Sequence, residues 1–298
     1  MVKPVIPPEE QIIKLNRYLM RNADQLPSPV ITVGGQAVMY WYEVYLQAYE
    51  KKPDVIYISS VDVDYVTRRE SVAIIARVFN VDAHLQKVFN PPSIAVLDLI
   101  DKDTGKIKED EEGIFLNPRE MEPNVVDIID RPAGFDVDDF SDKKLLLNTE
   151  PYCVLPEYQG DVTSHAKVLV LNPIACIRSR LANATVPMGK DKLTEVARIK
   201  ALAVPVYNYL LDKFETLEFH ESRKYLNYYC DVIWQRSYRR FQALHHIPLY
   251  IILESLLTEL MSNPEDYNVP SSFIQQELPH RIAWLKSEYE RISKSVQP

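Results

Sequence analysis

Two aspartates, Asp62 and Asp64, lie two positions apart within residues 60–65 and are the acids best placed for chemistry. The preceding run 55–58 is β-branched and aromatic, which predicts a buried strand that leads into them. Alternate residues of a strand share a face, so the two carboxylates are expected about 7 Å apart. Such a pair repels itself and resists burial unless a cation lies between the charges. The spacing predicts a Mg²⁺ site that also binds phosphate, because Mg²⁺ typically combines one or two carboxylates with substrate phosphates.

A third carboxylate is expected from Asp127, which lies between Val126 and Ile128 in a second apolar strand. An unpaired carboxylate in such a strand is costly. If this strand pairs beside the first, three acids converge. One of them can then act as general base on an attacking hydroxyl, while the others hold metal ions that bind a triphosphate. Asp98 and Asp130 remain alternatives for the third position.

The pair Gly34-Gly35 lies between a predicted strand (30–33) and a predicted helix (37–50). Glycines at this position let backbone N–H groups approach an anion, and the N-terminus of the following helix favours negative charge. The pattern therefore favours a second phosphate contact. An ordinary tight turn between strand and helix is the alternative.

Composition narrows the class of protein. The chain has 298 residues, a net charge of -8, 21 prolines and only 7 glycines, with neither a GxGxxG nor a GxxxxGK[ST] motif. This argues against a Rossmann or P-loop nucleotide site. The three cysteines are widely spaced and lack a CxxC pattern, which is typical of reduced thiols in a cytoplasmic protein. No run approaches the ~18 apolar residues of a membrane span, and the N-terminus does not resemble a signal peptide, so no membrane partner is expected.

The pattern of elements predicts an α+β protein: a mixed sheet with flanking helices in residues 1–171, followed by an all-α domain in residues 172–298. Strands are expected at 30–33, 55–58 with 60–66, 94–100, 124–130, 144–147 and 167–171. Helices are expected at 7–21, 37–50, 68–79, 173–183, 190–214, 219–245, 248–262 and 272–294, with a kink at Pro205.

Two motifs together resemble a known superfamily. The run Gly34-Gly35-Gln36-Ala37-Val38 is similar to the opening motif of AbiEii-type abortive-infection toxins, and residues 60–65 (SVDVDY) resemble their S-x-D-hydrophobic-D-aromatic motif. These toxins belong to the nucleotidyltransferase superfamily, with a polymerase-β-like fold. The resemblance implies a nucleotidyltransferase-like sheet domain followed by a helical domain with a cationic first helix.

The resemblance also implies the roles of particular residues. Asp62 and Asp64 would be metal ligands and Asp127 the base or a shared ligand. The triphosphate would contact the backbone of Gly34 and Gly35, the Ser60 hydroxyl and the cations Arg180 and Lys190. The cofactor would be Mg²⁺ or Mn²⁺ and the substrate an NTP. The acceptor would be a hydroxyl of RNA, protein or a small molecule, and a toxin role with an antitoxin partner would follow.

A basic, aromatic segment at 223–246 could stack on the bases of an RNA acceptor such as tRNA. Helical spacing of its aromatic residues equally predicts burial. The main alternative function is therefore a catalytically degenerate fold that acts as a protein- or nucleic-acid-interaction module. A phosphohydrolase that uses the same acids is a third possibility, without a His-Asp metal motif to accompany it.

Overall fold

The strands and helices were located in a computed structural model, which describes residues 3–58, 60–87, 92–154, 166–186 and 191–296. The strands are β1 (Val30–Thr32), β2 (Val63–Val66), β3 (His84–Leu85), β4 (Ser93–Asp98), β5 (Leu116–Asn117), β6 (Glu122–Pro123), β7 (Val125–Ile129), β8 (Thr149–Pro151) and β9 (Val168–Leu171). The α-helices of the first 172 residues are α1 (Pro8–Arg21), α2 (Gly34–Val44), α3 (Val55–Ile58), α4 (Val72–Phe79) and α5 (Leu145–Asn148).

The remaining helices follow the last strand. They are α6 (Pro173–Thr185), α7 (Lys192–Ala201), α8 (Ala203–Thr216), α9 (Phe219–Trp234), α10 (Arg236–Leu244), α11 (Ile251–Ser262) and α12 (Leu278–Val296). Single turns of tighter or wider helix are η1 (Ala23–Gln25), η2 (Leu46–Ala48), η3 (Arg69–Ser71), η4 (Val137–Phe140) and η6 (Phe273–Glu277). The chain is therefore α+β with a helical C-terminal region, as the sequence predicted.

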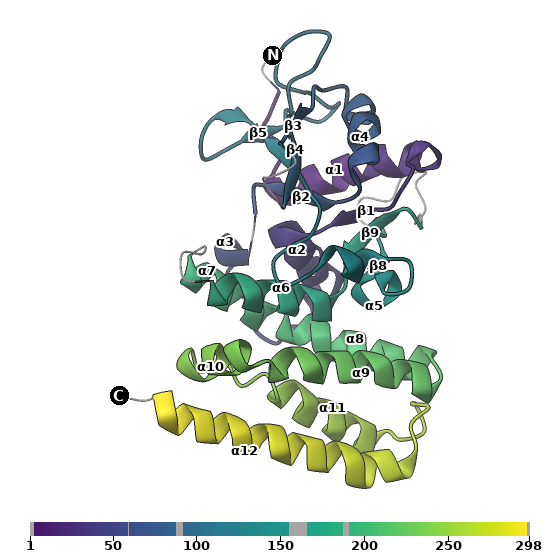
Figure 1. Cartoon of the computed structure of the whole chain (residues 1–298), viewed down its shortest axis with the longest axis vertical. Helices are drawn as coiled ribbons and strands as arrows, with labels where there is room; N and C mark the ends of the chain where they lie inside the picture. Colours follow the sequence, from purple (N-terminus) through teal and green to yellow (C-terminus); the bar gives the residue numbers. More distant parts are fainter. Residues whose placement is uncertain (1–2, 59, 88–91, 155–165, 187–190, 297–298) are drawn as a thin grey trace. The chain divides into compact units, whose positions relative to one another are not determined.

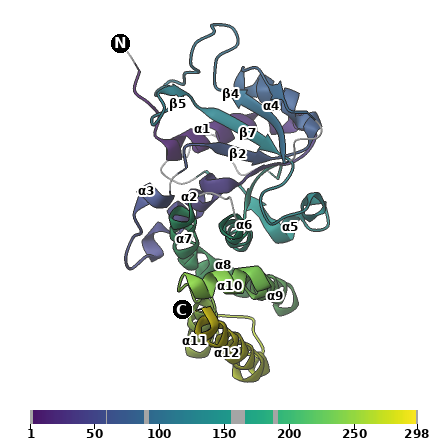
Figure 2. The ribbon, with the colours of Figure 1, turned by 60° about the vertical axis from the view of Figure 1, so that its left-hand side comes forward.

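Within the described residues, a seven-stranded mixed sheet has the order β3-β4-β7-β2-β1-β9-β8. The pairs β7/β2 and β1/β9 are parallel, and the other neighbours are antiparallel. Figure 2 shows β4, β7 and β2 side by side with α1 behind them. The non-consecutive order brings segments that are more than 60 residues apart in the sequence onto adjacent strands, with Val63 opposite Val126.

One face of the sheet is the apolar core of its unit. Tyr65, Val126 and Ile128 are fully buried on it, together with Leu15 of α1 and Phe79 of α4. Each such side chain stabilises the fold by roughly 1.5–3 kcal/mol through burial. Residues one position away on each strand point to the opposite face, which is only partly covered. That opposite face carries the acids of interest.

The chain divides into two compact units, which we describe separately. The α/β unit comprises 1–40 and 58–172, and the helical unit comprises 41–57 and 173–298. The division after residue 172 lies next to the expected boundary, but 41–57 groups with the helices instead of the sheet. Hydrogen bonds to the helices account for this: Tyr49 Oη donates to the carbonyl of Ala201 at 2.6 Å, and Tyr45 Oη donates to Asp212 at 2.7 Å.

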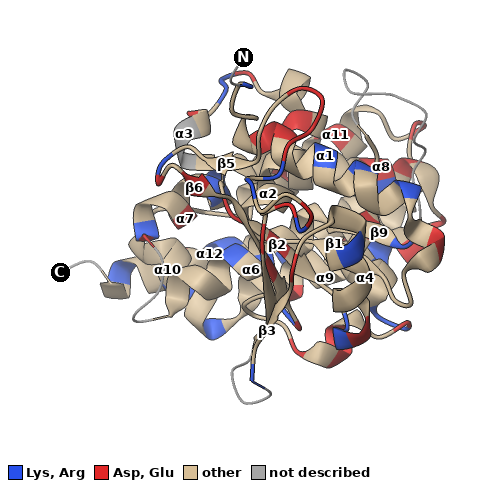
Figure 3. Ribbon diagram, turned by 90° about the horizontal axis from the view of Figure 1, so that it is seen from above, with Lys and Arg blue, Asp and Glu red and all other residues tan. Residues whose placement is uncertain are grey.

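Figure 1 shows the ribbon of the helical unit, in which α12 packs on α10 and α8 packs on α9 and α11. Basic and acidic residues recur along its helices (Figure 3), and several of them form ion pairs. Arg223 pairs with Glu277 at 2.5 Å, for example, and Arg239 with Glu288 at 3.5 Å. Among the helices in the described ranges, none combines the length and apolar character needed to cross a bilayer.

Two predicted strands are wrong. Residues 55–58 form the short helix α3, in which Val55 is 38% exposed while Ile58 is buried. A short apolar run does not distinguish a strand from a helical turn. Residues 144–147 belong mostly to α5, where the buried Asn148 side chain donates to the Asp139 carbonyl at 2.8 Å and fixes the turn.

Several predicted helices also have different limits. The helix predicted at 190–214 is divided at Leu202 into α7 and α8, and Pro205 lies in the first turn of α8. Proline is tolerated there because the N–H it lacks has no partner in a first turn. Gln235, in an extended conformation, divides the predicted 219–245 helix into α9 and α10. α2 begins at Gly34, three residues earlier than expected.

Candidate functional site

The condition on which convergence of the acids depended, that the two acid-bearing strands lie side by side, is met. β2 and β7 are parallel neighbours, and Asp64 lies opposite Asp127 in the register. Side chains opposite each other on adjacent strands share a face and are about 5 Å apart at Cβ. Both residues are partly exposed, on the side of the sheet away from Tyr65. Two carboxylates are therefore brought together from positions 63 residues apart.

Tyr65 supports the strand from the other face. It is fully buried, and its hydroxyl donates to Asn16 Oδ1 on α1 at 2.7 Å. Burial raises the pKa of Tyr65 well above its usual value, so the hydroxyl stays protonated and keeps this bond. Asn16 also bonds Thr32 Oγ1 of β1 at 3.1 Å. The strand that carries Asp64 is thus fixed against α1 by a buried polar network.

Asp62 lies apart from this pair. It occupies the bend before β2 and is exposed, because the strand begins only at Val63. The Ser60 hydroxyl donates to the Asp62 carbonyl at 3.4 Å, and the Ser60 carbonyl accepts a bond from Gln36 on α2. These contacts tie residues 60–62 to the helix that follows Gly34 and Gly35.

Gly34 and Gly35 form the first turn of α2, beside Asp64. Gly34 has φ +70°, and a Cβ built on it would overlap Asp64 Oδ2. The position therefore requires glycine for two reasons, backbone conformation and close approach of a carboxylate. The three features that the sequence singled out, the glycine pair, Ser60 and Asp64, lie together at one end of β1 and β2.

The two alternative acids differ in their surroundings. Asp98 is on β4, where it lies opposite Val125 and pairs with His84 at 3.4 Å. Asp130 follows β7, and its Oδ2 accepts from Arg131 at 3.1 Å. Its Oδ1 is buried and has no hydrogen-bond partner among the described residues. Of the three candidates, Asp127 is the one aligned with Asp64.

The described residues contain no group of three or more His, Cys, Asp or Glu side chains spaced to hold a metal ion together. Asp64 and Asp127 nevertheless fit Mg²⁺ by the chemistry of their donor atoms, since Mg²⁺ is often bound through two carboxylates plus substrate phosphates and water. An all-protein metal cage is a different kind of site. The two carboxylates on the sheet form a site of the open kind, in which substrate phosphates and water would complete the coordination.

Arg180, expected as a phosphate-binding cation, lies in the helical unit and is 3% exposed. Its Nη1 pairs with Glu195 at 3.2 Å, and its Nη2 donates to Ser179. Arg198 lies 3.8 Å from the same carboxylate. The charge of Arg180 is therefore partly neutralised by Glu195 within the helical unit. Lys190, the other expected cation, lies outside the described residues.

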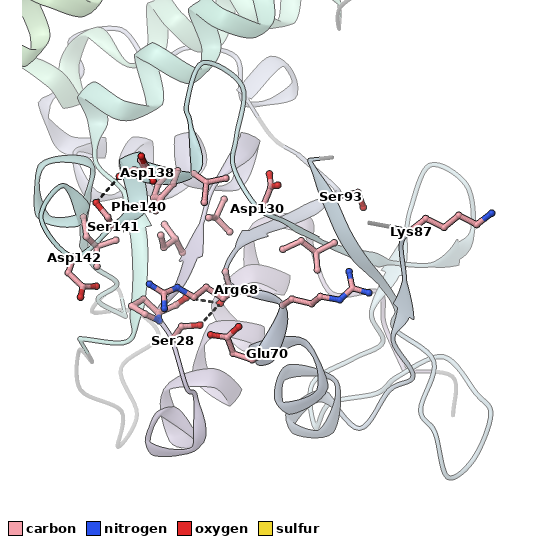
Figure 4. Close-up of a pocket in the computed structure, with 18 residues that line it drawn as sticks. Ser28, Arg68, Glu70, Lys87, Ser93, Asp130, Asp138, Phe140, Ser141 and Asp142 are labelled. Atoms are coloured by element: carbon pink, nitrogen blue, oxygen red, sulfur yellow. Dashed lines mark hydrogen bonds between the residues drawn. The ribbon is translucent and has the colours of Figure 1, made fainter. Parts of the chain in front are cut away.

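A cavity that the sequence did not predict lies on the acid-bearing face of the sheet. Its volume is about 510 Å³, and Ile31, Val66 and Ile94 belong to its lining. Val66 is two residues from Asp64 on the same strand, so it shares its face about 7 Å away. Figure 4 shows Phe140 and Ser141 on one side of the cavity and Lys87 and Ser93 on the other. The lining comes from five separate segments, so no local motif announces it.

The basic segment 223–246 is mostly committed to the helical unit. Tyr229 is fully buried and donates to the Leu249 carbonyl at 2.8 Å, and Tyr238 is also buried. Arg239 lies 3.8 Å above the Trp234 ring and pairs with Glu288. The aromatic spacing here is a burial signal in large part.

Comparison of the chain with protein-family models, with curated proteins and with solved structures finds no match. What the protein does must be inferred from the residues described above.

Proposed function

We propose that the protein is a metal-dependent nucleotidyltransferase that moves a nucleoside monophosphate from an NTP to a hydroxyl group. The observation that carries this is the alignment of Asp64 with Asp127 on adjacent parallel strands, with Gly34 against the first carboxylate. Two carboxylates on one partly exposed face of the sheet supply oxygen ligands of the kind that Mg²⁺ combines with substrate phosphates. The resemblance of residues 34–38 and 60–65 to nucleotidyltransferase motifs supports the same chemistry.

Asp64 and Asp127 would hold Mg²⁺ or Mn²⁺, which would neutralise charge on the triphosphate. The first turn of α2 contributes the positive end of an 11-residue helix, and phosphate oxygens bind well at such an end. The Ser60 hydroxyl lies in the adjoining bend and can donate to the same anion. Glycine at 34 and 35 keeps side chains out of this approach.

Asp127 is the residue proposed to take the proton from the acceptor hydroxyl. It lies one strand further from α2 than Asp64, on the side of the sheet that leads to β4. A base in that position can face an acceptor while the triphosphate lies over the glycines. The triphosphate would then lie at the α2 end of the site, and the acceptor would lie toward the cavity.

The test is NTP binding by calorimetry, with and without Mg²⁺, on wild type and on an Asp62→Asn, Asp64→Asn variant. Mg²⁺-dependent binding should weaken at least tenfold in the variant, because the oxygen ligands lose their charge. Asp82→Asn, an exposed acid outside the site, is the matched control and should bind as wild type does. Equal binding by wild type and the double variant would contradict the proposal.

The second candidate is a non-catalytic interaction module that retains this fold. One observation favours it: the Asp64 carboxylate lies at the N-terminus of α2, where a negative charge stabilises the helix without any metal. The same calorimetry separates the two functions. A module would bind RNA in a salt-dependent manner and show no Mg²⁺-dependent affinity for NTP.

A further inference from the structure

The cavity beside the acid pair has the position and size of a binding site for a second substrate. Its 510 Å³ lies within the 300–1,000 Å³ range of small-molecule pockets. Its lining includes Val66, two residues beyond Asp64 on the same strand and face, but neither Asp64 nor Asp127. It is therefore adjacent to the proposed reaction centre yet separate from the glycines that would bind the triphosphate.

The lining of the cavity indicates the class of ligand. The floor is apolar, with Ile31, Val66 and Ile94 from three strands. Phe140, at the end of η4, and Leu145, at the start of α5, add further apolar surface. Its charged residues are three cations and four anions: Arg68, Arg69, Lys87, Glu70, Asp130, Asp138 and Asp142. A polyphosphate or an RNA backbone would meet more negative than positive charge here. A neutral or cationic organic molecule fits this lining better.

Asp130 adds an independent observation. It lines the cavity, and its Oδ1 is buried without a hydrogen-bond partner among the described residues, while Oδ2 accepts from Arg131. Buried polar atoms normally have a partner, and an unsatisfied carboxylate oxygen is costly. Since Oδ1 has no exposed surface, the Asp130 side chain must turn toward the cavity before a ligand hydroxyl or ammonium group can donate to it.

We infer that this cavity is the acceptor site, and that the acceptor is a small molecule with an apolar body that carries hydroxyl or amino groups. The inference rests on the proposed function. Of the three acceptors considered there, RNA, protein and a small molecule, it selects the small molecule. Asp130 anchors one donor group of the ligand, and a hydroxyl of the same ligand reaches Asp127, three residues earlier on the chain. In the transfer step the hydroxyl oxygen bonds the α-phosphorus, the α–β phosphoanhydride bond breaks, pyrophosphate leaves, and the hydroxyl proton passes to Asp127.

Three indoles of equal ring size test the site by ligand-observed NMR and calorimetry on the full chain: tryptamine, tryptophol and indole-3-propionate. Tryptamine and tryptophol should bind, and the anionic propionate should bind about tenfold more weakly, since it faces the Asp130 oxygen. Asp130→Asn should weaken tryptamine about tenfold, as expected for loss of a charge-assisted bond. Asp82→Asn should leave its affinity within about twofold of wild type, because this acid lies outside the cavity. Preferential binding of the propionate would overturn the assignment.

A second pair of variants blocks the space itself. Val137→Trp fills the cavity from a lining residue that is 55% exposed, and Leu85→Trp places the same ring at a site outside the lining that is 57% exposed. Probe binding should be lost only in Val137→Trp. Equal binding by both variants, or displacement of the probes by an RNA oligonucleotide or by Mg²⁺–NTP, would show that the cavity is not a small-molecule acceptor site.

Failure of this inference and failure of the proposed function give different results. Asp64→Asn should weaken Mg²⁺-dependent NTP binding and leave tryptamine binding intact. If the wild type binds the probes but does not bind NTP, the nucleotidyltransferase proposal is overturned, and the acceptor role of the cavity with it. Intact NTP binding without any probe binding would overturn the acceptor site alone.

Discussion

Charge is arranged differently in the two units of this protein. In the helical unit, Glu195 is fully buried and has Arg180 at 3.2 Å and Arg198 at 3.8 Å. In the α/β unit, Asp64 and Asp127 lie opposite each other on adjacent strands of a partly exposed sheet face. The first arrangement joins opposite charges and specifies packing. The second juxtaposes like charges, whose mutual repulsion opposes the pairing of the two strands. Sign and burial of neighbouring charges therefore distinguish a structural cluster from a candidate reaction centre.

Removing the buried carboxylate should have the largest effect on stability. Glu195→Gln leaves two arginines without their counter-charge in a buried environment, and we expect the free energy of unfolding to fall by about 3–5 kcal/mol. Urea denaturation followed by circular dichroism measures this. Glu221→Gln is the control, because Glu221 pairs with Lys224 at the surface and exposed pairs contribute about 0–1 kcal/mol. Similar losses in both variants would show that the buried cluster is not special.

The second effect concerns the close approach of Gly34 to Asp64. Gly34→Ala should destabilise the α/β unit by about 2–4 kcal/mol, because a positive φ costs about 1–2 kcal/mol for alanine and the new methyl group overlaps the carboxylate. Gly105→Ala is matched in φ, at +65° against +70°, but has open space around it. It should lose only about 1–2 kcal/mol.

A double-mutant cycle sharpens this result. In an Asp64→Ala background, the cost of Gly34→Ala should fall to that of Gly105→Ala, since only the backbone conformation remains unfavourable. An unchanged cost would mean that the carboxylate does not lie against Gly34.

The third effect is smaller and has the opposite sign. Asp127→Asn removes repulsion between aligned carboxylates, so the metal-free protein should gain roughly 0.2–1 kcal/mol. The same variant should lose the rise in melting temperature that Mg²⁺–NTP gives the wild type, since a ligand stabilises only the state that it binds. Destabilisation of the metal-free variant would show that Asp127 stabilises the fold, as Glu195 does in the helical unit.

The smallest effect is a pH dependence in the helical unit. Burial, followed by the positive charges of Lys192 and Lys200 and by His246, lowers the pKa of His245 below its usual value of about 6.5. The unfolded chain then binds a proton more readily than the folded one, so stability is complete above about pH 6.5 and declines as pH falls below it. His245→Gln should flatten this slope in urea midpoints between pH 5 and 8, whereas His280→Gln, an exposed site, should retain it.

Local chemistry in the sequence was enough to find the parts of the site. The apolar run around Asp127, the glycine pair that begins α2 and the strand at Tyr65 were each predicted from propensity and spacing. Local chemistry failed at 55–58 and 144–147, where short apolar runs form helical turns. It also did not identify the partner of Arg180. A cation on an apolar helix can pair equally well with a phosphate and with a buried glutamate such as Glu195.

The sequence by itself therefore determined the α+β class, the helical second half and the residue types available for chemistry, because these depend on periodicity and composition along short segments. Only the tertiary structure decided which acids meet. Strand order β7-β2-β1 aligns Asp127 with Asp64 and leaves Asp62 on the preceding bend. It also decided that residues from 28 to 145 enclose a cavity beside them. Register and enclosure depend on contacts between distant segments, and no local pattern in the chain encodes them.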